Sequence, residues 1–117
     1  MPFSESDTHL RGILESIRHI ERFVEGMDLD AYRQNEKTMS AVERKIQILT
    51  EAVIRLESQG PERFPDIDWK AHRGLGNFLR HSYHRVSDEI VWDTINEDLP
   101  SLREIAERAL RHDRRVN

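Results

Sequence analysis

Apolar residues recur at steps of three and four positions along most of the chain, which is the spacing of amphipathic helices. The first stripe, in a helix expected from Ser4 or Asp7 to about Gly26, contains Leu10, Ile13, Leu14, Ile17, Ile20, Val24 and Met27. The second alternates steps of four and three, as in helices that pack side by side, and contains Val42, Ile46, Leu49, Val53 and Leu56. We predict that this second long helix stops at Gly60, ahead of Pro61.

The segment between these two helices is polar. Asp28 or Asp30 is a suitable N-cap for a short helix that runs through Tyr32. The following RQNEKT fits either a turn or a continuing exposed helix, so the pattern leaves this boundary open.

A third helix is expected after the loop at residues 61–68, which contains two prolines and a phenylalanine, Phe64, that should pack against the bundle. Asp68 is the expected N-cap of this helix, which should run from Trp69 to about His84.

Two further helices are expected in the C-terminal part. Ser87 is a candidate N-cap, and the apolar face that follows contains Ile90, Val91, Ile95 and Leu99, with Trp92 at its edge. Pro100 fits the first turn of a last helix, whose inward side contains Leu102, Ile105, Ala109 and Leu110. No segment alternates with the period of a strand. The sequence therefore predicts an all-α, up-and-down bundle of four to five helices, folded as a single domain over residues 1–117.

The composition narrows the class of protein. Of the 117 residues, 37% are hydrophobic and 34% are charged, and cysteine is absent, which excludes disulfides and thiol chemistry. We find neither a signal peptide nor an apolar run long enough to span a membrane, so the expectation is a cytoplasmic protein. The net charge of −4 argues against a protein that coats nucleic acid indiscriminately.

The stretch from Trp69 to Val86 departs from this acidic background. It has no Asp or Glu, and its basic and titratable residues are Lys70, His72, Arg73, Arg80, His81, His84 and Arg85. The chain has 18 Lys and Arg, and removing the 4 in this stretch leaves 14 against 22 acidic residues. Cations interleaved with imidazoles suit a site for phosphate or for a nucleic-acid backbone. The alternative is a solvated face of the bundle.

On an ideal helix, Leu75, Leu79 and Val86 share the core-facing arc, and the polar groups lie opposite: Arg73, Asn77, Arg80, His81 and His84. This surface contains no motif for nucleophilic catalysis and no phosphate-binding glycine loop. His81 and His84 share a face at a three-residue step but have no third ligand nearby, so no metal or cofactor is expected. What remains is acid-base chemistry by an imidazole beside guanidinium groups, which suits RNA cleavage by the substrate's own 2′-hydroxyl.

The run W-x4-GLGN-x3-H-x-Y-x2-V, followed by DEIVWDTINEDLPSL, resembles the HepT-like branch of the HEPN superfamily over nearly the whole chain. That resemblance implies a small helical toxin, encoded beside a nucleotidyltransferase antitoxin, whose homodimer cleaves RNA in a shared cleft. The family motif is Arg, four residues, His, one residue, Tyr. His81 and Tyr83 match its histidine and tyrosine, and Asn77 matches the polar residue after the arginine, but Gly76 occupies the position of the arginine itself.

The missing arginine puts catalysis in question. On an ideal helix Arg73 and Arg80 lie about 80° and about 100° from His81, so either side chain is a candidate replacement, with Arg80 preferred. We expect His81 to act as general acid or base, the arginine to stabilise the transition-state charge and Asn77 to hold the phosphate.

Further roles are expected along the same stretch. Lys70, His84 and Arg85 are candidate RNA contacts. The resemblance implies that Tyr83 accepts AMP from the nucleotidyltransferase partner. Two alternatives stay open: a catalytically inactive HEPN module that binds nucleotide or the nucleotidyltransferase, and a structural bundle without a site.

Overall fold

All regular elements of the described chain are helices. The structure is a computed structural model and describes residues 5–59, 62, 64, 65, 67–72 and 88–116, with the backbone alone for 112–116. The elements are α1 (Glu5–Phe23), α2 (Leu29–Arg33), α3 (Glu36–Ser58), α5 (Asp88–Asp93), the π-helical segment η2 (Thr94–Asp98) and α6 (Leu99–Val116). The predicted all-α bundle is confirmed.

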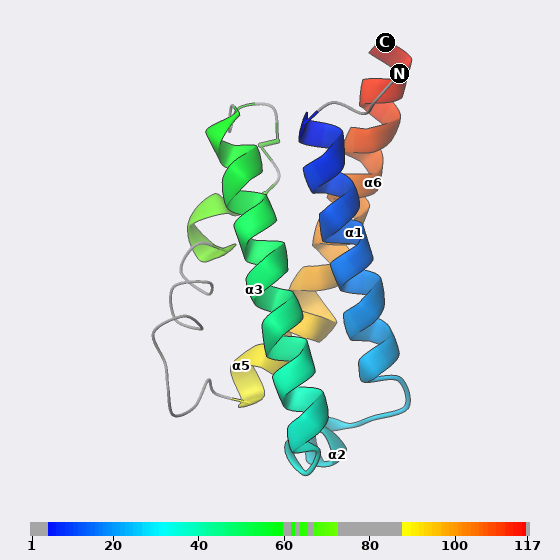
Figure 1. Ribbon diagram of the computed structural model, residues 1–117, viewed down its shortest axis with the longest axis vertical. Helices are drawn as coiled ribbons and strands as arrows, with labels where there is room; N and C mark the ends of the chain where they lie inside the picture. Colours follow the sequence, from blue (N-terminus) through cyan, green and yellow to red (C-terminus); the bar gives the residue numbers. More distant parts are fainter. Residues whose placement is uncertain (1–4, 60–61, 63, 66, 73–87, 117) are drawn as a thin grey trace.

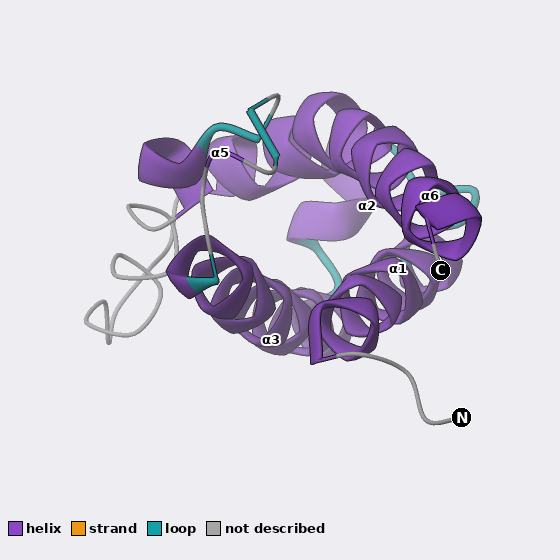
Figure 2. Cartoon of the chain, turned by 90° about the horizontal axis from the view of Figure 1, so that it is seen from above, coloured by secondary structure: helices purple, strands orange, loops and turns teal. Residues whose placement is uncertain are grey.

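The long helices α1, α3 and α6 form the body of the bundle (Figure 1). α1 packs against both α3 and α6, and α2 lies across one end, as the view along the bundle shows (Figure 2). The second predicted stripe is fully buried, and the first is buried at four positions and partly buried at Leu14, Val24 and Met27, which confirms the helical interpretation of their spacing. The core side chains of these three helices are Leu10, Ile13, Ile17, Ile20, Val42, Ile46, Leu49, Val53, Leu56, Leu99, Leu102, Ala106 and Leu110.

Side-chain caps define the boundary that the sequence pattern left open. Asp28 caps α2 by accepting a hydrogen bond from the backbone N–H of Ala31 at 2.8 Å. Asn35 caps α3 in the same way, accepting from the N–H of Thr38 at 3.0 Å. RQNEKT therefore contains the end of one helix and the beginning of the next.

The segment after α3 brings the chain to the start of the basic stretch. The α3 helix ends at Ser58, whereas the predicted stop at Gly60 and Pro61 lies outside the described residues. Phe64 is buried, as predicted, and contacts Trp69 edge to face, with ring centroids 6.3 Å apart.

Pro100 lies in the first turn of the last helix, α6, as predicted, but α6 is not separated from the helix before it. From Asp88 to Val116 the helical residues are continuous, with η2 between α5 and α6. The N–H of Leu99 bonds to the carbonyl of Thr94, five residues back. Pro100 has no N–H, and in a regular α-helix its ring would clash with the carbonyl of Asn96, so a wider turn ahead of Pro100 relieves this conflict. The expected N-cap Ser87 lies outside the described residues.

Among the described helices, none is long and apolar enough to cross a membrane.

Candidate functional site

Most of the predicted site residues lie outside the part of the chain that the structure describes. These are Arg73, Gly76, Asn77, Arg80, His81, Tyr83, His84 and Arg85. Lys70 is described and is exposed in the first turn of its helix. The geometry that can be examined is therefore that of the two ends of the basic stretch.

The N-terminal end is a capped helix start, as predicted. Residues 69–72 are helical, and Asp68 accepts a hydrogen bond from the N–H of Ala71 at 3.0 Å. Trp69 is held against the core by Phe64, so the first turn has a fixed attachment to the bundle. This attachment leaves Lys70 facing solvent, where it can contact an anion.

His72 lies at the end of this turn and is half-buried. Burial lowers the pKa of its imidazole, and the negative charges of Asp98 and Asp68 oppose that shift. Since the pKa falls below the ordinary 6.5, the neutral imidazole dominates at neutral pH. Asp98 is the last residue of η2, so the π-helical segment acts electrostatically on the start of the basic helix. His72 had no individual predicted role.

The C-terminal end of the stretch leads into α5, which is attached to α2. The Arg33 guanidinium contacts Glu89 at 2.8 Å, and its Nε lies 3.9 Å from Asp88 Oδ2. Beside this pair, Tyr32 packs on Trp92 with ring centroids 5.3 Å apart. Both contacts join residues far apart in the sequence and hold the first turn of α5 in place.

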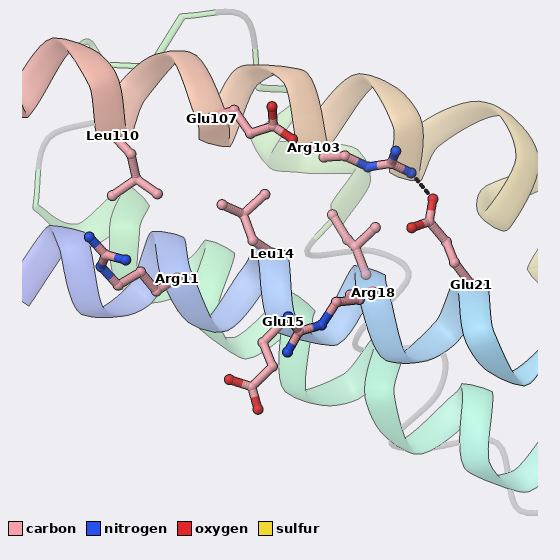
Figure 3. Close-up of a pocket in the computed structure, with 9 residues that line it drawn as sticks. Arg11, Leu14, Glu15, Arg18, Glu21, Arg103, Glu107 and Leu110 are labelled. Carbon is pink, nitrogen blue, oxygen red and sulfur yellow. Dashed lines mark ion pairs between the residues drawn. The ribbon is translucent and has the colours of Figure 1, made fainter.

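A separate groove is lined by residues of α1 and α6. These two helices lie away from the turn at residues 69–72 (Figure 1). The groove measures about 540 Å³, and the guanidinium of Arg103 reaches across it to Glu21 (Figure 3). Its lining residues are Arg11, Leu14, Glu15, Ile17, Arg18, Glu21, Arg103, Glu107 and Leu110. Three guanidinium groups face three carboxylates, so its charge does not select a cation or an anion.

The described residues contain no group of three His, Cys, Asp or Glu side chains arranged to hold a metal ion.

Comparison with known proteins decides the family. The family described as Ribonuclease HepT-like matches residues 13–109, which is most of the chain. The chain belongs to the HepT-like ribonuclease family. The match includes both ends of the basic stretch and the motif positions between them.

Relatives of similar length carry related names. A protein of Methanocaldococcus jannaschii designated a candidate RNase is 32% identical over 92% of this chain and 89% of its own length. A second candidate RNase of that organism is 31% identical over 84% of this chain and 90% of its own length. A candidate ribonuclease HepT of Thermococcus cleftensis is 30% identical over 81% of this chain and 86% of its own length. No solved structure matches the chain significantly.

The family assignment confirms the resemblance drawn from the GLGN, His81 and Tyr83 positions. It also agrees with the helical bundle seen here. The individual roles assigned to motif residues stay predictions.

Proposed function

We propose that this chain is a ribonuclease that cleaves RNA without a metal ion, in a cleft formed by two copies of the chain. The observation that carries the proposal is the family match over residues 13–109, a span that contains His81 and Tyr83. The acid-free basic stretch supports RNA as the substrate, since it provides cations in an otherwise acidic chain.

In this proposal His81 moves the proton of the 2′-hydroxyl or of the leaving group. Arg80, or Arg73 in its place, stabilises the charge that develops on the phosphate, and Asn77 orients the phosphate. Lys70, His84 and Arg85 bind the RNA backbone. The exposure of Lys70 agrees with its part in this arrangement.

The test is cleavage of RNA by purified protein in the presence of a chelator. Removing a general acid or base typically costs about 100-fold or more, so His81→Ala should lose at least that factor. His19→Ala is the control, because His19 is a half-buried histidine on α1 with an acidic neighbour, Glu15, at 4.0 Å. Equal cleavage by His81→Ala and the unmodified protein would remove His81 from the mechanism.

Two arginine variants distinguish the replacements for the missing motif arginine. If Arg80 serves, Arg80→Ala should lose most of the activity and Arg73→Ala little of it, and the reverse result assigns the role to Arg73. Loss in neither variant contradicts both assignments.

We further propose that the ribonuclease is the toxin of a toxin-antitoxin pair and acts in the cytoplasm. A nucleotidyltransferase partner would inactivate it by transferring AMP to Tyr83, which adds negative charge where RNA binds. Co-expression followed by mass spectrometry should find an adduct on the peptide that contains Tyr83, and Tyr83→Phe should lack it. An unmodified Tyr83 in growth-rescued cells contradicts this role.

A second candidate function is favoured by one observation, the glycine at position 76. A chain without the motif arginine can act as an inactive module that binds nucleotide or the nucleotidyltransferase. Growth arrest on expression, relieved by the partner, supports the toxin, whereas binding without growth arrest or RNA cleavage supports the inactive module.

A further inference from the structure

Two acidic residues follow directly after the stretch that contains the proposed RNA contacts. Asp88 and Glu89 lie in the first turn of α5, whereas no Asp or Glu occurs from Trp69 to Ser87. Carboxylates at the start of a helix are favourable, because they lie at the positive end of the helix dipole. The same two charges repel the phosphates of RNA that binds beside them. They therefore favour the helix and oppose RNA binding.

Covalent geometry keeps these carboxylates close to the proposed RNA contact Arg85. Three peptide links join Arg85 to Asp88, so their Cα atoms are at most about 11 Å apart. The Debye length is about 10 Å at 0.1 M salt, so charges at this separation are only partly screened. A phosphate bound at this end of the basic stretch is therefore sensitive to the charges of Asp88 and Glu89.

A cation from another helix lies against both carboxylates. Arg33 is the last residue of α2, and its Nη2 is 2.8 Å from Glu89 Oε1. Its Nε is 3.9 Å from Asp88 Oδ2. The guanidinium therefore offsets one of the two negative charges that follow the basic stretch.

Buried contacts, more than these ion pairs, attach α5 to the bundle. The side chains of Arg33 and Glu89 are 39% and 68% exposed, and ion pairs this exposed add little to stability. Beside them, Tyr32 packs on Trp92 with ring centroids 5.3 Å apart, and Val91 is 1% exposed. Removing the Arg33 guanidinium should therefore change the local charge more than the local structure.

From this arrangement we propose that Arg33 determines RNA affinity by neutralising the acidic residues that follow the basic stretch. Arg33 acts through Asp88 and Glu89 and does not touch the RNA. This role rests on the proposed binding of RNA by the basic stretch, but it does not require that the RNA is cleaved.

The experiment measures binding of a labelled RNA strand by fluorescence anisotropy. The strand carries 2′-O-methyl groups, so it cannot be cleaved through its 2′-hydroxyl. Arg33→Gln leaves one more uncompensated negative charge and should weaken binding about two- to fivefold at low salt, and added salt should reduce the difference. Its Tm should fall by less than about 4 °C. Arg33→Lys keeps the charge and should bind RNA as the unmodified protein does.

Arg103→Gln is the matched control. The side chain of Arg103 is 38% exposed and pairs with a glutamate of another helix, Glu21, so this variant also loses one positive charge and one ion pair between helices. It should bind RNA as tightly as the unmodified protein, because the lost charge lies on α6 and not beside the basic stretch. An equal loss of affinity in Arg103→Gln and Arg33→Gln overturns the proposal.

Neutralising the carboxylates distinguishes a charge effect from a structural one. The double variant Asp88→Asn, Glu89→Gln also loses both ion pairs, yet it should bind RNA at least as tightly as the unmodified protein. Adding Arg33→Gln to this double variant should not weaken binding. Weak binding by the double variant would show that the pairs act by holding the structure. Weak binding only when Arg33→Gln is added would show that Arg33 contacts the RNA itself. Either result contradicts neutralisation.

Failure of this proposal can be told apart from failure of the ribonuclease proposal. Equal affinity of Arg33→Gln and the unmodified protein overturns the role of Arg33 and leaves cleavage unaffected. Binding that depends on Arg33 without any cleavage supports this role and contradicts the ribonuclease. Absence of RNA binding by the unmodified protein contradicts both.

Discussion

Removing the Asp68 cap tests whether the start of the basic helix positions the residues that follow it. In the structure, Asp68 Oδ1 accepts from the N–H of Ala71 at 3.0 Å, and the carboxylate lies at the positive end of the helix dipole. Replacing an N-cap aspartate by alanine costs about 1 kcal/mol, within a range of about 0.5 to 2 kcal/mol. For a chain of this size, about 1 kcal/mol corresponds to a fall in Tm of about 4 °C.

The assay compares three variants by thermal unfolding and by RNA cleavage well below the Tm. Asp68→Ala should lose about 4 °C, whereas Asp68→Asn keeps a side-chain acceptor and should lose little. Asp28→Ala removes the equivalent bond of α2, which measures 2.8 Å, and should cost about as much stability as Asp68→Ala. Cleavage should fall for Asp68→Ala and stay near the unmodified level for Asp28→Ala.

Two results would refute this reasoning. If Asp68→Asn unfolds at the same temperature as Asp68→Ala, the hydrogen bond is not the source of the stability. If Asp28→Ala loses as much cleavage as Asp68→Ala, the activity follows overall stability and not the start of the basic helix.

The remaining predictions concern groups at different degrees of burial. The pKa of Glu43 is raised above 4.5, so its charged form is unfavourable in the fold; Glu43→Gln should gain stability above the folded-state pKa and show no gain below pH 4.5, measured by urea unfolding across pH. The pKa of His72 is lowered below 6.5, so stability is fully present above pH 6.5 and falls as the pH drops through the folded-state pKa. His72→Gln should flatten this part of the profile. Ile46→Ala removes a side chain that is fully buried on α3 and should cost about 2 to 5 kcal/mol, whereas Ile90→Ala, at a half-exposed position, should cost less than about 1 kcal/mol in the same unfolding experiment.

The helical body of the protein was predictable because its apolar spacing is regular. In α3, Val42 through Leu56 keep one narrow face, and all five members of the stripe are buried. The short α2 helix could also be placed, since Asp28 is a strong N-cap. Asn35 is an equally good N-cap and could have indicated the start of α3. Its neighbours in the sequence are also polar, so it did not stand out as the boundary between the two helices.

The π-helical segment was not predictable from periodicity. Pro100 correctly indicated the first turn of the last helix, but nothing in the apolar spacing indicated the wider turn ahead of it, in which Ile95 is buried and after which Leu99 is buried. Long-range contacts could not be predicted from local sequence patterns either. Arg33 and Glu89, for example, are 56 positions apart, and nothing in the sequence around either residue indicates that they pair.

The sequence motif of the candidate site could be recognised from the family resemblance, whereas the local structure around the site could be predicted only in part. The cap at Asp68 and the exposure of Lys70 follow from local rules and agree with the structure. The environment of His72 could not be predicted from local rules, because one of the negative charges that act on it is that of Asp98, 26 positions away in the sequence. Its place on the core-facing arc of an ideal helix, with Leu75 and Leu79, was the available signal.

The most direct test of RNA cleavage by the substrate's own 2′-hydroxyl is the nature of the cleaved bond. Purified protein in a chelating buffer is given an RNA strand and the same strand with 2′-deoxy substitution throughout. The RNA should be cut to fragments ending in a 2′,3′-cyclic phosphate and the deoxy strand should stay intact, since the attacking group is the 2′-hydroxyl. Cleavage of both strands, or of neither, would contradict it.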